Sequence, residues 1–217
     1  MRKITGFESK EEIPVKVQQL YRGVMELILE GADVRTLKVS DITQKAGIGK
    51  GTAYDYFDTR EEIIVSAILH TMVCIQEEVE AELALRTGFF DRMEYLLEVL
   101  EEKMAERECF LHFIHLLTDT SICGLKLQER IRETGQENRT LVSMLVDMLR
   151  EGVESGELRD DLSIGYLCYA VSAQLVCFMA SISFPDIGPQ PAEELKACIL
   201  AQMRESYGRK EGLKKIV

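Results

Sequence analysis

Hydrophobic residues recur at intervals of three and four along most of this chain, and no segment shows the period of two that is typical of a β-strand. The pattern is weaker from residue 121 to 138, where Gly124 and Gly135 interrupt it. The clear stripes predict helices that include residues 17–28, 39–46, 64–83, 93–104, 110–117, 141–149, 162–185 and 195–203. The sequence therefore predicts an all-α fold without internal repeats.

A pair of short helices is predicted between residues 38 and 60. Val39, Ile42 and Ala46 share one face of the first helix. Gly47 follows where a helix end favours positive φ, and the chain turns into a second short helix. Ala53 and Phe57, four residues apart, are predicted to face inward. Two short helices joined by a tight glycine turn are typical of a helix-turn-helix.

The outer face of the second helix carries side chains suited to nucleic acid. Its ammonium, hydroxyl and phenol groups can bind phosphate oxygens and base edges, and Gly51 allows close backbone approach. Residues 50–52 lie at the helix N-terminus, the end that a recognition helix directs into the major groove. The face consists of Lys50, Gly51, Thr52, Tyr54, Asp55 and Tyr56. The stretch is a very weak match to a nucleotide-binding P-loop, because Lys50 is followed by Gly51 rather than Ser or Thr and no strand precedes it.

This stretch resembles the DNA-binding signature of the tetracycline-repressor-like (TetR) family of bacterial transcription regulators. The matching residues are Val39, Ile42-Thr43, Ala46-Gly47-Ile48-Gly49, Lys50-Gly51-Thr52-Ala53-Tyr54, Tyr56-Phe57 and Arg60-Glu61. Lys38 and Gly49 replace the usual Thr and Ser caps, and lysine is a poor N-cap. Ala53 stands where leucine is common, and Asp55 adds a negative charge to the outer face.

The resemblance implies two domains: a helix-turn-helix DNA-binding domain of residues 1–60 and a helical ligand-binding and dimerisation domain of residues 61–217. It implies a homodimer, formed through helices near 162–185 and 191–207, that binds a pseudo-palindromic double-stranded operator and acts as a repressor under the control of a small-molecule effector. The long helix after Thr59 would link the two domains. The implied DNA contacts are Ser40, Lys50, Gly51, Thr52, Tyr54, Tyr56 and Arg60.

The family resemblance also implies an effector cavity inside the second domain. Methionine suits such a cavity because its flexible thioether adapts to irregular space, although it fills ordinary cores equally well. The predicted lining is Met104, Phe113, Leu117, Met144, Met148, Tyr166, Tyr169 and Gln174.

The net charge of −11 is unevenly distributed. Residues 1–60 carry 10 Lys and Arg against 9 Asp and Glu, whereas residues 61–217 carry 16 against 28. DNA would therefore be repelled from most of the molecule and tolerated at one end.

The six cysteines have no metal-binding or redox spacing, and the N-terminus has no signal peptide, so we predict reduced thiols and a cytoplasmic location.

The uncharged stretch 162–185 is long enough to cross a bilayer. Its hydroxyl and amide groups favour a helix buried between neighbours, and we predict no membrane contact.

A second hypothesis is a metal-dependent sensor or a helical enzyme. Cys109, His112, His115 and Asp119 follow one another at helical spacings and could hold a transition metal. The same histidines could equally lie at the edge of a packed face. We find no base, nucleophile and orienting group that would make a catalytic set, so we predict a non-enzyme without catalytic residues, cofactor or metal. A third hypothesis is an acidic helical adaptor that binds only protein.

Overall fold

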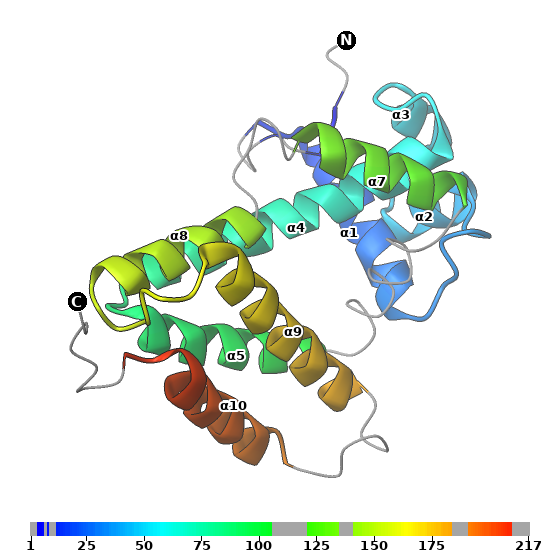
Figure 1. The fold of residues 1–217 in the computed structure, drawn as a ribbon. Coiled ribbons are helices and arrows are strands. Elements are labelled where there is room, and N and C mark those ends of the chain that lie inside the picture. Colours follow the sequence, from blue (N-terminus) through cyan, green and yellow to red (C-terminus); the bar gives the residue numbers. More distant parts are fainter. Residues whose placement is uncertain are drawn as a thin grey trace. The chain divides into compact units, whose positions relative to one another are not determined.

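The computed structural model describes residues 4–6, 8, 12–105, 121–134, 141–183 and 191–209 (Figure 1). Within these ranges there is no strand, and an isolated bridge joins Leu158 to Gly208. The all-α prediction is confirmed. The helices are α1 (Val15–Leu29), α2 (Val39–Lys45), α3 (Lys50–Tyr54), α4 (Arg60–Ala84), α5 (Phe89–Ala105), α7 (Ile122–Thr134), α8 (Leu141–Glu154), α9 (Ile164–Ser183) and α10 (Ala192–Tyr207).

The chain forms two compact units. The first contains Met1–Glu78 and Arg107–Asn138, and the second contains Val79–Glu106 and Arg139–Val217. The long helix α4 therefore begins in one unit and ends in the other. The predicted boundary after residue 60 does not coincide with the division between these two compact units. As a boundary between a DNA-binding and a regulatory domain, it stays a prediction.

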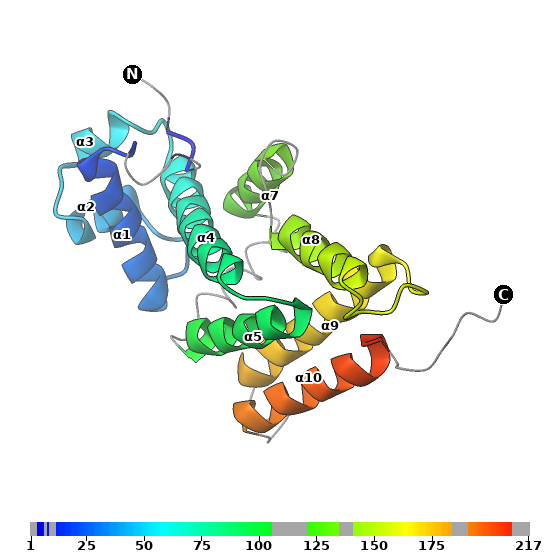
Figure 2. The same cartoon turned by 90° about the vertical axis from the view of Figure 1, so that its left-hand side faces the viewer.

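The first unit is built around one hydrophobic core that α1, α2, α3, α7 and the first part of α4 share. Figure 2 shows α1, α2 and α3 beside the first part of α4. The α1 stripe predicted from the sequence is buried in it, as are Ile42, Ala53 and Phe57. Pro14 immediately precedes α1 and supplies the preset φ that favours a helix start. The spacing of apolar residues in the sequence thus identified the helix faces that pack into this core.

Two glycines end α1 and α2 in the same way. Gly31 and Gly47 have φ of 85° and 67°, a region that residues with a Cβ rarely adopt. After Gly47, the Ile48 N–H donates to the Thr43 carbonyl oxygen at 3.0 Å, which closes a Schellman motif. This bond fixes the direction in which the chain leaves α2 for α3, as the sequence predicted for Gly47.

The poor cap at Lys38 is compensated from inside the helix. The Asp41 carboxylate accepts a hydrogen bond of 3.1 Å from the Lys38 backbone N–H. Asp41 also lies in the first turn of α2, where a negative charge interacts favourably with the helix dipole. The start of α2 is therefore stabilised without the usual threonine.

Helix α7 lies where the sequence pattern was weak. It has few apolar residues, but Cys123, Leu127 and Ile131 are spaced four apart and so share one face. Cys123 and Leu127 are buried in the core of the first unit, and Ile131 packs against it. A narrow stripe on an otherwise polar helix was too faint a signal to predict α7 from the sequence.

The second unit packs α5 against α8, α9 and α10. The Glu157 carboxylate accepts a hydrogen bond from the Phe89 N–H and so caps α5, while the Glu157 carbonyl accepts from Arg209 N–H at 2.9 Å. The segment after α8 therefore ties the start of α5 to the end of α10. Apolar residues from all four helices fill the interior, including Phe89, Met93, Leu97, Met144, Met148, Leu149, Leu167, Val171, Phe178 and Met203.

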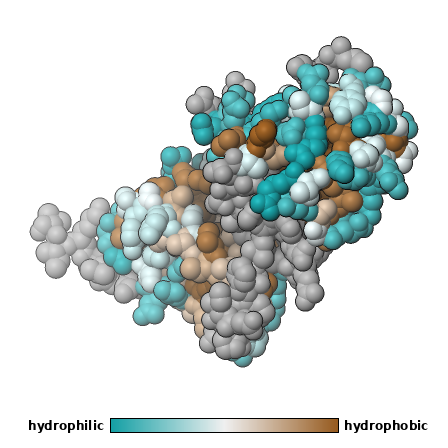
Figure 3. Space-filling view, turned by 90° about the vertical axis from the view of Figure 1, so that its right-hand side faces the viewer, coloured by the Kyte–Doolittle hydropathy of each residue, from teal (hydrophilic) through white to brown (hydrophobic). Residues whose placement is uncertain are grey.

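Helix α9 has several exposed apolar residues among the described part of the chain. It is the one helix of the described residues that is long and apolar enough to cross a membrane, with a mean hydropathy of 1.5, and 22% of that span is buried. Figure 3 shows groups of hydrophobic residues between hydrophilic ones on the face of the molecule that it views. The exposed residues of α9 follow helical spacing at Tyr166, Tyr169, Ala173, Val176, Cys177 and Ala180.

Candidate nucleic-acid interface

Helix α3 carries four of the seven residues predicted to contact DNA. Ala53 is fully buried and fixes the inner face of the helix against the core. Lys50 and Gly51 are exposed, Thr52 is half-buried, and the Tyr54 side chain is 49% exposed. No atom lies within 4 Å of the place where a Gly51 Cβ would stand, so a flat surface could approach this backbone closely.

The helix is shorter than the sequence predicted. It ends at Tyr54, so Asp55 is its C-cap and Tyr56 lies in the turn that follows. The Tyr56 and Phe57 N–H groups both donate to the Ala53 carbonyl oxygen, at 3.2 and 3.1 Å. Placing Tyr56 on the outer face of a helix was therefore wrong. Tyr56 is half-buried and packs against the core, although its role as a phosphate ligand stays a prediction.

Ser40 lies on the exposed side of α2. Its hydroxyl donates a hydrogen bond of 3.3 Å to the Asp41 carboxylate, which is the group that also caps α2. Rotation of the hydroxyl would free it for a phosphate oxygen without moving the backbone. The predicted phosphate contact is thus sterically open and untested.

A close crossing of α1 and α2 positions the helix pair. A Cβ at Gly23 would lie 3.1 Å from the Ala46 nitrogen and 3.2 Å from the Ile42 carbonyl oxygen. Both atoms belong to the backbone of α2, so they can yield only if the helix moves. The absence of a side chain at Gly23 therefore sets how closely α2 approaches α1.

Arg60 has contacts that the sequence did not predict. Its Nη1 donates to the carbonyl oxygens of Arg35 and Leu37, at 2.8 and 3.1 Å, and its Nε donates to the Glu61 carboxylate at 2.9 Å. Burial opposes ionisation of Glu61, but its own backbone N–H, Arg60 and Lys126 outweigh this and lower its pKa. The predicted phosphate ligand is thus engaged inside the unit, where it holds the chain just before α2.

Thr59 caps α4 with its side chain. Its hydroxyl accepts a hydrogen bond of 3.2 Å from the Glu62 N–H, while the Glu62 carboxylate accepts one of 2.9 Å from the Asp58 N–H. The same hydroxyl oxygen accepts a hydrogen bond of 3.3 Å from Lys126 of α7. Sequence reasoning missed Lys126 because 67 residues separate it from Thr59.

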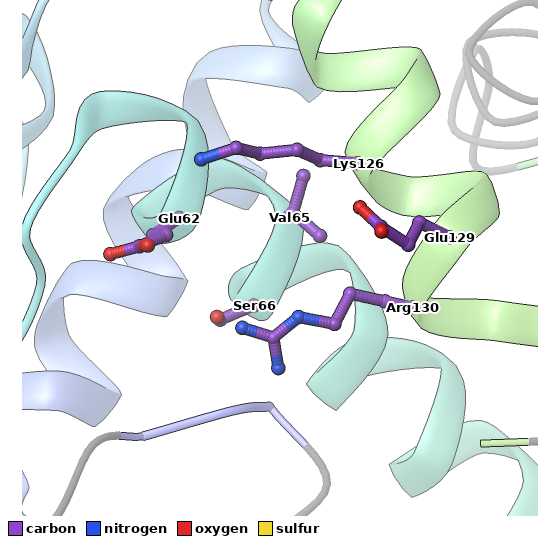
Figure 4. Close-up of a pocket in the computed structure, with 6 residues that line it drawn as sticks. All are labelled: Glu62, Val65, Ser66, Lys126, Glu129 and Arg130. Carbon is purple, nitrogen blue, oxygen red and sulfur yellow. The ribbon is translucent and has the colours of Figure 1, made fainter. Parts of the chain in front are cut away.

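Lys126 lies at a small polar pocket between α7 and α4 within the first unit. Lys126 and Arg130 reach from α7 towards α4 (Figure 4). Two glutamates balance these two cations, so the pocket has no excess of either charge and offers no specific anion site. Its lining residues are Glu62, Val65, Ser66, Lys126, Glu129 and Arg130.

The predicted effector-binding residues fall into four groups. Met144 and Met148 are buried on α8, whereas Tyr166 and Tyr169 are 51% and 74% exposed on α9. Gln174 is half-buried, and its Oε1 has no hydrogen-bond partner among the described residues. Phe113 and Leu117 lie outside the described residues, as does the Met104 side chain. A single chain does not bring the two tyrosines into the interior beside the methionines, and the cavity stays a prediction.

The metal hypothesis falls on residues that the structure does not describe. Cys109, His112, His115 and Asp119 all lie within 106–120. Elsewhere in the described ranges, no group of three or more His, Cys, Asp or Glu side chains could hold a metal ion.

Comparison with known proteins finds similarity to transcriptional regulators. No protein-family model matches the chain. The fatty acid metabolism regulator protein of Bacillus subtilis (strain 168) is 24% identical over 151 residues, which are 69% of this chain and 74% of that protein.

Solved structures agree over most of the chain. The transcriptional regulator FadR from Bacillus subtilis, in complex with stearoyl-CoA, superposes with a TM-score of 0.67 at 19% identity, covering 86% of this chain and 96% of that one. A TetR transcriptional regulator from Chloroflexus aurantiacus gives 0.67 at 17% identity, covering 90% and 98%. The resemblance seen in the sequence is confirmed, because the chain has the all-α fold of the TetR-family transcriptional regulators.

Proposed function

We propose that this protein is a ligand-responsive transcriptional repressor that binds a pseudo-palindromic operator as a homodimer. One observation carries the proposal: Lys50, Gly51 and Tyr54 are exposed on a short helix whose opposite face is anchored by the fully buried Ala53. A rigid helix with outward donors and an open backbone is suited to a major groove. The DNA contacts are Ser40, Lys50, Gly51, Thr52, Tyr54 and Tyr56, and Arg60 orients the unit.

We infer the homodimer from the exposed apolar residues of α9. Its exposed apolar residues lie on a single stripe, and burial of such a stripe against a second copy would remove it from water. The exposed face of α10 carries small residues at helical spacing (Ala197, Cys198 and Ala201), which permit close helix packing. Two copies joined here would present two α3 helices to successive major grooves.

We propose a long-chain acyl-CoA as the effector. The support is the similarity to a fatty acid metabolism regulator and to FadR, whose structure holds stearoyl-CoA. The buried methionines Met93, Met144, Met148 and Met203 give the second unit a deformable apolar interior of the kind that can accommodate an alkyl chain. By linkage, an effector that releases DNA must bind the DNA-free state more tightly. The protein acts in the cytoplasm, where both ligands are found.

The test is selection of bound sequences from random duplex DNA at a stated salt concentration. We expect a two-fold related motif, with half-sites about one helical turn apart. Replacing Lys50 by Gln should weaken binding to all sequences and lower the salt slope by about one. Failure to enrich any motif, together with an absence of salt-dependent binding, would exclude a DNA-binding function.

The effector is tested separately with stearoyl-CoA, added to the complex with the enriched duplex. We expect release of the duplex, with free coenzyme A as the control. Release by neither compound would remove the acyl-CoA proposal and leave DNA binding intact.

A further inference from the structure

Helix α7 is a structural part of the DNA-binding unit although it is distant in sequence. Cys123 and Leu127 are 1% and 0% exposed, in one core cluster with Ile42, Ala53 and Phe57. The last three residues belong to or directly follow the helix pair. The apolar face of α7 therefore forms part of the hydrophobic core that also contains the buried residues of the helix pair.

A polar contact lies beside this apolar face. The Lys126 ammonium donates to the Thr59 hydroxyl at 3.3 Å, and that hydroxyl also accepts from the Glu62 N–H at 3.2 Å. Thr59 is the N-cap of α4, so Lys126 contacts the residue at which α4 begins. Glu61 and Glu62 bring negative charge to the same turn, which favours a cation there.

The residue that follows Thr59 continues the connection towards the DNA-binding helices. Arg60 donates to the carbonyl oxygens of Arg35 and Leu37, immediately before the N-cap of α2. Thr59 and Arg60 are consecutive in the sequence. Thr59 contacts α7 and Arg60 contacts the segment before α2, so the two residues connect these helices. A change in how α7 packs would act on the segment that orients the helix pair.

We propose that α7 is a detachable support of the DNA-binding helices and that Lys126 is a positioning residue for DNA binding. This inference rests on the proposed function. Helix α7 lies within Arg107–Asn138, a segment that belongs to the first unit. The residues immediately before and after this segment belong to the second unit. Docking of α7 stabilises the geometry that binds the operator, and its release weakens that geometry.

The first experiment compares Lys126→Met with Arg132→Met. Methionine keeps the length and apolar stem of Lys126 but removes the donor. Arg132 is exposed on the same helix, so its replacement removes an equal charge without a contact to Thr59. We expect Lys126→Met to weaken binding to the enriched duplex about tenfold with an unchanged salt slope, Arg132→Met to change it less than about twofold, and Lys126→Arg to restore it.

The second experiment uses the native Cys123 thiol as a reporter of docking. A buried thiol reacts only when the structure around it opens locally. Labelling followed by peptide mass spectrometry should show faster modification of Cys123 in Lys126→Met than in Arg132→Met, with Cys168 of the second unit as internal reference. Because coupling is reciprocal, the enriched duplex should slow Cys123 labelling in the wild type. A merely structural role for Lys126 would not make labelling respond to DNA.

Three results would overturn the inference. One is equal DNA affinity of Lys126→Met and Arg132→Met. Another is labelling of Cys123 that is indifferent to DNA although the wild type binds the duplex. The third is a reduced salt slope in Lys126→Met, which would make Lys126 a phosphate ligand. By contrast, a wild type that binds no duplex would end the proposed function itself.

Discussion

The Nη1 atom of Arg60 lies 3.1 Å from the carbonyl oxygen of Leu37 and donates a hydrogen bond to it across 23 residues of sequence. Leu37 precedes the N-cap of α2, and Arg60 is the first residue of α4. The helix-turn-helix therefore lies between two chain positions that a single guanidinium joins. This side chain is engaged within the protein at the position where the family resemblance implied a phosphate ligand.

Replacing Arg60 by Gln should separate these two roles. Loss of the bonds to Arg35 and Leu37 leaves carbonyl oxygens without their donor and should lower the stability of the first unit by about 1–3 kcal/mol. DNA affinity should fall while its salt slope stays unchanged, in contrast to Lys50→Gln, because no phosphate contact is lost. Urea unfolding and titrations at several salt concentrations measure both. A slope reduced by about one would instead identify Arg60 as a phosphate ligand.

Replacing Gly23 by Ala should destabilise the first unit although alanine is the better helix former. The new methyl group would press on the backbone of α2 at Ala46 and Ile42. We expect a loss of about 1–2 kcal/mol, because the strain exceeds the gain of up to about 1 kcal/mol in helix propensity. Gly165→Ala on α9 is the control, since nothing lies within 4 Å of its Cβ position, and it should be neutral or stabilising. Equal midpoints for both variants in thermal unfolding would contradict the tight crossing.

Glu61 should make the first unit less stable in acid. Its pKa is lowered in the folded protein, so its contribution is fully present above the ordinary value of 4.5 and disappears as the pH falls through the folded value. The Arg60–Glu61 pair is partly exposed, which limits the contribution to below about 1 kcal/mol. Urea unfolding of the wild type and of Glu61→Gln should differ near neutral pH and converge once the pH has fallen below the pKa of Glu61 in the folded protein. A difference that persists in acid would show that charge is not the cause.

Replacing Val176 by Glu should dissociate the dimer. The side chain is 56% exposed within one chain and lies on the apolar stripe of α9, where a carboxylate would have to be buried between subunits. Sedimentation velocity should show a monomer, and affinity for a two-half-site operator should fall with it. Leu85→Glu is the matched control, because Leu85 is exposed just beyond α4 and should leave the dimer unchanged. A monomeric wild type would remove the basis for this prediction.

The sequence predicted the first unit well where short-range rules apply. Ala53 and Phe57 were recognised as buried by their spacing, and Gly47 was recognised as a helix end by its need for positive φ. These rules depend on neighbours within one helical turn. They failed at Tyr56, because its N–H bonds to the Ala53 carbonyl three residues back instead of the carbonyl four residues back, and the regular α-helix ends before it.

By itself, then, the sequence determined the all-α class, the helix-turn-helix and the exposed donors of α3. Only the tertiary structure decided that Arg60 turns inward, that Gly23 sets the crossing of α1 and α2, and that α7 joins the hydrophobic core of the first unit. The physical reason is range. Periodicity and capping act over three to seven residues along the chain, whereas the Lys126–Thr59 and Arg60–Leu37 bonds join residues that approach one another only when the core has formed.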